Sequence, residues 1–181
     1  MIMWRWLIMS DGKSIRDFEN LGEYYQSIED ARLGAEQHIK EAWLCDEDVE
    51  ALGFFEAIWH ASTVILPALE VQVVIDGDNN CHVTTGSSGY VEFGMKPPIG
   101  MKLPIKCWIH THPFGSAYFS SVDWKTVNTW EGLMHSAYVL GGVEHYGYWT
   151  NEKPNLLMIR NVDENGVVST REQIQHRGEE E

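Results

Sequence analysis

Residues 105–123 read IKCWIHTHPFGSAYFSSVD, and this stretch decides the predicted fold. Its first part, up to His110, contains β-branched and aromatic residues and predicts a strand. Pro113 cannot donate a backbone hydrogen bond to a sheet, so the strand ends there and the chain turns. Ser120 followed three positions later by Asp123 is the pattern of a helix N-terminus. The stretch therefore predicts a strand, a turn and a helix in succession.

Three side chains of this stretch are suited to bind one metal ion. His110 and His112 are two positions apart at a strand end, so both imidazoles point to the same side and can approach an ion at about 2.0–2.1 Å. Asp123, in the first turn of the helix, can present a carboxylate oxygen to the same ion. Two histidines and one carboxylate leave a fourth position for water, which is typical of catalytic zinc sites. The sequence therefore predicts a zinc site.

The spacing of these residues carries the main functional signal. An H-x-H pair alone often arises by chance, and Ser120-x-x-Asp123 alone is an ordinary helix cap. Here His-x-His-Pro begins at His110, and seven residues, counted from Pro113 to Phe119, lie between His112 and the Ser-x-x-Asp that starts at Ser120. This arrangement resembles the signature of the JAMM, or MPN-plus, zinc metallopeptidases. The resemblance is specific over residues 107–123 and looser over residues 49–140.

The resemblance also implies two catalytic residues. In the family, a glutamate at the start of an upstream strand hydrogen-bonds the zinc-bound water as general base, and the motif serine helps to stabilise the oxyanion. Ser120 matches the serine. Glu70 is our choice for the base, because it follows an apolar helix, opens a predicted strand and lies 40 positions before His110.

The assignment of the general base has alternatives. The family often has a glycine three positions after this glutamate, whereas Val73 stands there in this chain. Glu92, on a predicted short strand at 90–93, and Glu56, inside a predicted helix, are the competing carboxylates. Each of the three could also be an ordinary solvated carboxylate. The sequence therefore favours Glu70 and leaves Glu92 and Glu56 open.

The remaining patterns predict how the chain is organised. Residues 1–48 form a small β-α appendage, with a strand at 3–9 and a helix that starts at Ser27. Residues 49–176 form the JAMM-like domain, and residues 177–181 form an acidic disordered tail.

Within the main domain, a helix over 49–62 precedes a hairpin of two strands, 69–75 and 81–85, and further strands follow the motif. We expect an α/β fold with one mixed or mainly antiparallel central sheet flanked by helices. From the resemblance, its layering should be JAMM/MPN-like, as in cytidine deaminases.

Charge and composition limit the partners. The 181 residues carry a formal net charge of −14, and nucleic-acid affinity comes mostly from Lys and Arg, so we expect no nucleic-acid partner. The apolar start, residues 1–9, is too short to span a bilayer, so we expect no membrane association and a cytoplasmic location. Three cysteines without C-x-x-C spacing indicate neither a disulfide framework nor a thiolate zinc site. The sequence does not predict the oligomeric state.

Together these features predict a zinc-dependent peptidase or isopeptidase that hydrolyses an amide bond. The resemblance implies a protein or peptide substrate, including removal of a ubiquitin-like protein from a lysine. The short separation of Glu70 and His110 leaves little room for added segments, so the chain looks closest to the compact microbial members. Two alternatives remain open: a non-catalytic MPN-type binding module, and a metal-dependent hydrolase of a non-protein amide.

Overall fold

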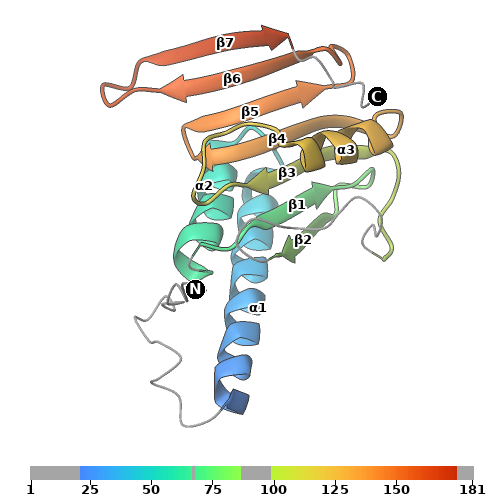
Figure 1. Cartoon of the computed structure of the whole chain (residues 1–181). Coiled ribbons are helices and arrows are strands. Elements are labelled where there is room, and N and C mark those ends of the chain that lie inside the picture. The colour runs from blue at the N-terminus through green and yellow to red at the C-terminus, as the bar shows by residue number, and fades with distance from the viewer. Residues whose placement is uncertain (1–20, 67, 87–98, 175–181) are drawn as a thin grey trace, which may run out of the picture.

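A computed structural model describes residues 21–66, 68–86 and 99–174. Within these ranges the strands form one seven-stranded sheet in the order β2-β1-β3-β4-β5-β6-β7 (Figure 1). The neighbours β3 and β4 are parallel, and the other neighbouring pairs are antiparallel. The strands are β1 (Val71–Ile75), β2 (Cys81–Thr85), β3 (Ile105–Thr111), β4 (Met134–Gly142), β5 (His145–Thr150), β6 (Leu156–Val162) and β7 (Val168–Ile174). The prediction of an α/β fold with one mixed, mainly antiparallel sheet is confirmed.

Helices lie on both faces of the sheet. Helix α1 (Leu21–Asp46) and helix α2 (Leu52–His60), which continues as the π-helix η2 (Ala61–Ile65), pack on one face. Helix α3 (Ser121–Trp130) connects β3 to β4 and lies over the other face (Figure 1). None of the helices in the described ranges is long and apolar enough to cross a membrane.

Strand β3 separates two apolar cores, because successive side chains on a strand point to opposite faces. Cys107 and Ile109 join the core beneath α1 and α2. Trp108 joins the core beneath α3, where it is 2% exposed. By the same alternation His110 points to the α3 face, whereas Thr111 points toward α2 and η2. The strand therefore places the predicted ligand on the side from which α3 approaches.

The structure confirms the predicted hairpin and corrects one helix boundary. Strands β1 and β2 pair antiparallel, as expected. Helix α1 already includes Leu21 and does not start at Ser27, so the cap-like sequence at 27–30 lies inside the helix. The Gln26 side-chain amide donates to Asp30 at 2.9 Å across one helical turn, an i,i+4 contact that supports a continuous helix through this sequence.

Some organisational predictions are not tested. The strands predicted at 3–9 and 90–93 and the tail at 177–181 lie outside the described residues. The division at residue 48 stays a prediction. In the packing, however, Ala35 and Ile39 of α1 share one core with α2 and β1.

Candidate metal centre

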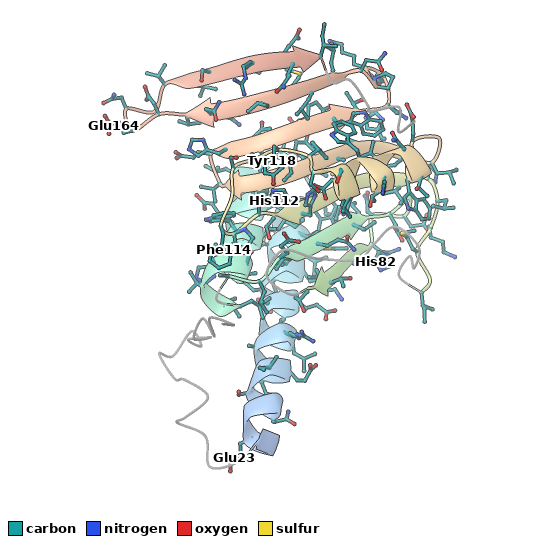
Figure 2. All side chains as sticks on the ribbon, viewed as in Figure 1. Glu23, His82, His112, Phe114, Tyr118 and Glu164 are labelled. Carbon is teal, nitrogen blue, oxygen red and sulfur yellow. The ribbon has the colours of Figure 1, made fainter. Side chains whose placement is uncertain are left out.

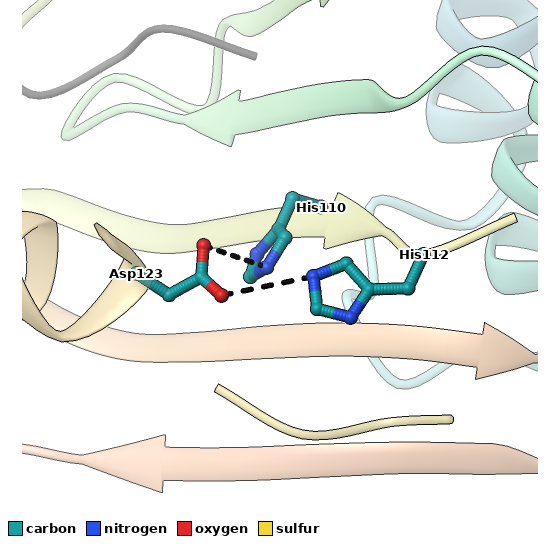
Figure 3. Close-up of side chains that lie close together, drawn as sticks. All are labelled: His110, His112 and Asp123. Carbon is teal, nitrogen blue, oxygen red and sulfur yellow. Dashed lines mark ion pairs between the residues drawn. The ribbon is translucent and has the colours of Figure 1, made fainter. Parts of the chain in front are cut away.

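The two halves of the motif meet at the carboxyl end of β3. The strand ends at Thr111, the chain turns over residues 112–119, and α3 begins again above the same sheet face. Figure 3 shows the side chains of His110, His112 and Asp123 converging there, the histidines from the strand end and the aspartate from the first turn of α3. The local prediction of strand, turn and capped helix is confirmed.

The spacing of the donor atoms fits a metal ion. His110 Nε2 lies 3.1 Å from Asp123 Oδ1, and His112 Nε2 lies 3.6 Å from Asp123 Oδ2. All three residues offer a ligand atom within 4.8 Å of the others. Donors placed about 2 Å from one ion in a tetrahedron are about 3.3 Å apart. This buried His-His-Asp group could therefore bind a metal ion.

The buried ring nitrogens of His110 support a metal site. The residue is 1% exposed, and neither nitrogen has a hydrogen-bond partner among the described residues. The 3.1 Å contact with Asp123 is within ion-pair range but does not have hydrogen-bond geometry. Trp108 stacks on the imidazole at a centroid distance of 4.5 Å and so holds the plane of the ring. Buried polar atoms without partners are rare in folded proteins, so an imidazole nitrogen that faces a carboxylate in this way is suited to coordinate an ion.

Asp123 serves the helix and the site together. The Ser120 backbone N–H donates to Asp123 Oδ2 at 2.6 Å, and the Asp123 N–H donates to the Ser120 hydroxyl oxygen at 3.3 Å, which completes a capping box. Burial alone would raise the pKa of Asp123, but the neighbouring His110, His112 and Ser120 hold it well below its usual range. The carboxylate is therefore ionised at neutral pH, as a metal ligand must be.

The loop between the ligands orients His112. The ring nitrogen Nδ1 lies 3.3 Å from the Ser116 carbonyl oxygen, an arrangement that leaves Nε2 facing Asp123. Burial opposes protonation, but the contact with Asp123, the charge of Glu70 and the Ser116 carbonyl raise the pKa of His112. Tyr118 packs edge-on against the same ring at 5.1 Å. The motif gives only the length of the segment 113–119, so the sequence did not predict these contacts.

A glycine beneath the loop lets it sit close to the sheet. A Cβ at Gly141 of β4 would lie 2.5 Å from the Ala117 nitrogen and 2.9 Å from the Ser116 carbonyl carbon. Real Cβ atoms essentially never approach backbone this closely, so any side chain at Gly141 would displace the loop. The absence of a side chain at Gly141 therefore leaves the space that the Ser116 carbonyl needs to contact His112.

Glu70 lies beside this group. It directly precedes β1, which pairs antiparallel with β3 so that Gln72 faces His110; two positions further along, the same register sets Glu70 opposite His112. The residue is 8% exposed. Burial, and to a smaller extent the charge of Asp123, raise the pKa of Glu70, while His112 partly opposes them. A buried carboxyl with a raised pKa next to candidate metal ligands has the properties of a general base.

Of the two competing carboxylates, the structure describes only Glu56. Glu56 is exposed on α2, on the opposite side of the sheet from α3. Glu92 lies outside the described residues. Among the other histidines, His82 pairs with Asp76 at 3.0 Å and His145 contacts Asn161 at 3.2 Å. Figure 2 shows His82 on β2, apart from His112.

Comparison with known proteins finds no relative. No family model, curated protein or solved structure matches this chain. The interpretation of the site therefore depends on its own residues and geometry.

Proposed function

We propose that this protein is a zinc-dependent amide hydrolase of the JAMM type. The observation that carries the proposal is the grouping of His110, His112 and Asp123 at ligand spacing, with the buried carboxyl of Glu70 beside them. A donor set of two imidazoles and one carboxylate is one of those found in catalytic zinc sites, which keep one position open. Ser120 and the motif spacing add the family resemblance described above.

In this proposal His110, His112 and Asp123 hold the zinc ion. A zinc ion in such a site supplies Lewis acidity and makes water a nucleophile near neutral pH. Glu70 accepts the proton of the attacking water and returns it to the nitrogen of the leaving amine, a role typically worth 10²–10⁴-fold in rate. The Ser120 hydroxyl donates a hydrogen bond to the oxyanion that forms from the scissile carbonyl.

The proposed substrate is a peptide or isopeptide bond, including one that joins a ubiquitin-like protein to a lysine. This assignment follows the resemblance of the motif. The net charge of −14 disfavours a nucleic-acid-associated reaction.

The first test joins metal analysis to an activity assay. Protein purified with zinc available should hold about one zinc per chain, and the His112→Ala variant should hold far less. The wild-type protein should cleave a member of a panel of ubiquitin-like fusions and short fluorogenic peptides. Glu70→Gln should retain zinc and fold but lose about 10²–10⁴-fold in kcat.

Two matched variants serve as controls. Glu56→Gln changes an exposed carboxylate and should leave activity unchanged. Glu92→Gln should also stay active; if it is the inactive variant and Glu70→Gln is active, Glu92 is the base and the zinc chemistry stands. Equal, near-zero zinc in the wild type and His112→Ala would refute the metal site. A zinc-loaded wild type that cleaves nothing would favour the binding module, or a hydrolase of a non-protein amide.

A further inference from the structure

Behind the candidate site, two buried hydroxyl groups link η2 to the ends of β1 and β3. The Ser62 hydroxyl oxygen lies 2.6 Å from the Leu69 carbonyl oxygen and 2.8 Å from the Thr111 hydroxyl oxygen. The Val71 backbone N–H donates to the Thr111 hydroxyl oxygen at 2.9 Å. Both Ser62 and Thr111 are 0% exposed. These contacts form a continuous chain of hydrogen bonds that begins at residue 71 and ends at residue 69.

The direction of every bond in this chain follows from its two ends. A backbone N–H can only donate and a carbonyl oxygen can only accept. The Ser62 hydroxyl therefore donates to the Leu69 carbonyl, which leaves its oxygen to accept from Thr111. Thr111 in turn accepts from the Val71 N–H. Each hydroxyl donates once and accepts once, so the chain is fully satisfied and has one arrangement.

Glu70 is the residue enclosed by this chain. Its two neighbours, Leu69 and Val71, supply the terminal carbonyl and the terminal N–H. Its own carbonyl oxygen accepts from the Gly86 N–H at 2.9 Å, and the Leu69 N–H lies 3.3 Å from the Ser62 carbonyl oxygen. The backbone on both sides of Glu70 is thus held by groups from η2 and β3.

Unusual backbone accompanies these contacts. Ser62 lies in a π-helix, a form that appears mostly as short segments and often at functional sites. Ala68, two residues before Glu70, has a φ of 63°, a left-handed conformation that a non-glycine residue rarely adopts. A residue in such a strained conformation persists where the surrounding contacts hold the backbone in place. The hydroxyl chain supplies such contacts directly before the predicted general base.

Thr111 connects this anchor to the metal ligands. It lies between His110 and His112, and the alternation of the strand turns its side chain to the face opposite His110. Residues 110–112 therefore have two roles. His110 and His112 are the proposed ligands on the α3 face, and Thr111 holds the backbone next to Glu70 on the other face.

We infer that Ser62 and Thr111 are positioning residues, which set the Glu70 carboxyl relative to the metal ligands through the backbone of residues 69–71. The inference rests on the proposed function, because it assigns the two hydroxyls a role through the general base. Both residues are fully buried, so their role is exerted through the backbone and not by contact with a substrate. A displacement of about 1 Å at a catalytic group can lower a rate by about 10²-fold, so the loss of this anchor has a measurable consequence.

The test compares Thr111→Val with Thr111→Ser. Valine has the shape of threonine but lacks the hydroxyl, whereas serine retains it. In Thr111→Val, kcat should fall roughly 10- to 100-fold with zinc content and KM unchanged, and Thr111→Ser should restore most of it. Exchange of the Val71 backbone amide, measured with zinc-free protein as well, should accelerate about tenfold or more in Thr111→Val.

A double-variant comparison separates positioning from general destabilisation. In a Glu70→Gln background, Thr111→Val should cause little further loss of kcat, because both changes act through one group. Ser62→Ala provides a second, independent break in the chain if Thr111→Val folds poorly. Thr63→Val is the matched control, since that hydroxyl donates to the Trp59 carbonyl at 2.8 Å and not to the Glu70 segment; its kcat should equal that of the wild type.

The possible failures are distinguishable. A wild type that cleaves nothing in the substrate panel refutes the proposed function. Unchanged Val71 exchange in Thr111→Val and Ser62→Ala overturns the present inference whether or not the protein is active. An active enzyme in which Thr111→Val keeps full kcat, or in which its effect adds in full to that of Glu70→Gln, overturns the inference and leaves the proposed function standing.

Discussion

Two buried aspartates, Asp76 and Asp123, face histidines in different parts of this molecule. Asp76 follows β1 and is 0% exposed; it lies 3.0 Å from His82. Asp123 lies in the first turn of α3, is 8% exposed and lies 3.1 Å from His110. Both carboxyl groups have a lowered pKa, because their neighbours outweigh the opposing effect of burial. By residue type, burial and charge the two sites look alike.

The two sites differ in how their hydrogen-bonding capacity is used. Three contacts reach each oxygen of Asp76, from the side chains of Asn80 and His82 and from the backbone N–H groups of residues 78, 80 and 102. The Asp123 carboxylate accepts one hydrogen bond among the described residues, from the Ser120 backbone N–H. The His110 Nε2 atom that faces it has no hydrogen-bond partner there. A saturated carboxylate organises a turn, whereas one that faces an imidazole nitrogen without a hydrogen-bond partner has capacity for an ion.

The same substitution should affect zinc binding at Asp123 and folding stability at Asp76. Asp123→Asn removes a charged ligand and should weaken zinc binding by more than about 100-fold, since even indirect partners of ligands are worth 10–100-fold. Asp76→Asn should keep one zinc per chain but lower the free energy of unfolding by about 3 kcal/mol, because it replaces an acceptor of several charge-assisted hydrogen bonds. Zinc titration and urea unfolding of both variants measure the two effects. Zinc loss in Asp76→Asn would show that the two sites are not separate.

Acid should reveal the contribution of Asp76 to stability. A folded pKa below the unfolded value of about 3.9 means that the stabilisation is complete above that pH and is lost as the pH falls toward the folded pKa. The slope for one such group approaches about 1.4 kcal/mol per pH unit.

Urea unfolding of zinc-free protein between pH 5 and 2 checks this, since metal release then adds nothing to the slope. Asp76→Asn should have the shallower acid limb. Parallel limbs for the variant and the wild type would assign the acid sensitivity to other groups.

The smallest expected effects come from alanine substitutions at two glycines, one beneath the loop that orients His112 and one beside Asp76. Gly141→Ala should displace the loop that orients His112 and weaken zinc binding about tenfold. Gly77→Ala, beside Asp76, places a Cβ 3.1 Å from the Pro104 carbonyl oxygen, a milder contact. It should cost under about 1 kcal/mol of unfolding free energy and leave zinc affinity unchanged. Equal zinc affinity in both variants would indicate that the loop adapts without moving the ligands.

The sequence by itself determined the local elements and the candidate ligand group. His110, His112 and Asp123 lie within fourteen residues, on a strand end and the first turn of the next helix. Their convergence depends on strand alternation and helix capping, which are local rules. The hairpin of β1 and β2 was predictable for the same reason, because its turn residues lie between two short runs rich in β-branched residues.

Only the tertiary structure decided what surrounds that group. Whether Glu70 lies next to His112 depends on the register of β1 against β3, which pairs residues about forty positions apart. The sequence could not distinguish the saturated Asp76 from Asp123, since the donors to Asp76 include a backbone N–H from residue 102. The link between Ser62 and Thr111 spans 49 positions and forms where η2 packs behind β3. Such contacts depend on the simultaneous packing of several elements, so no local pattern in the sequence specifies them.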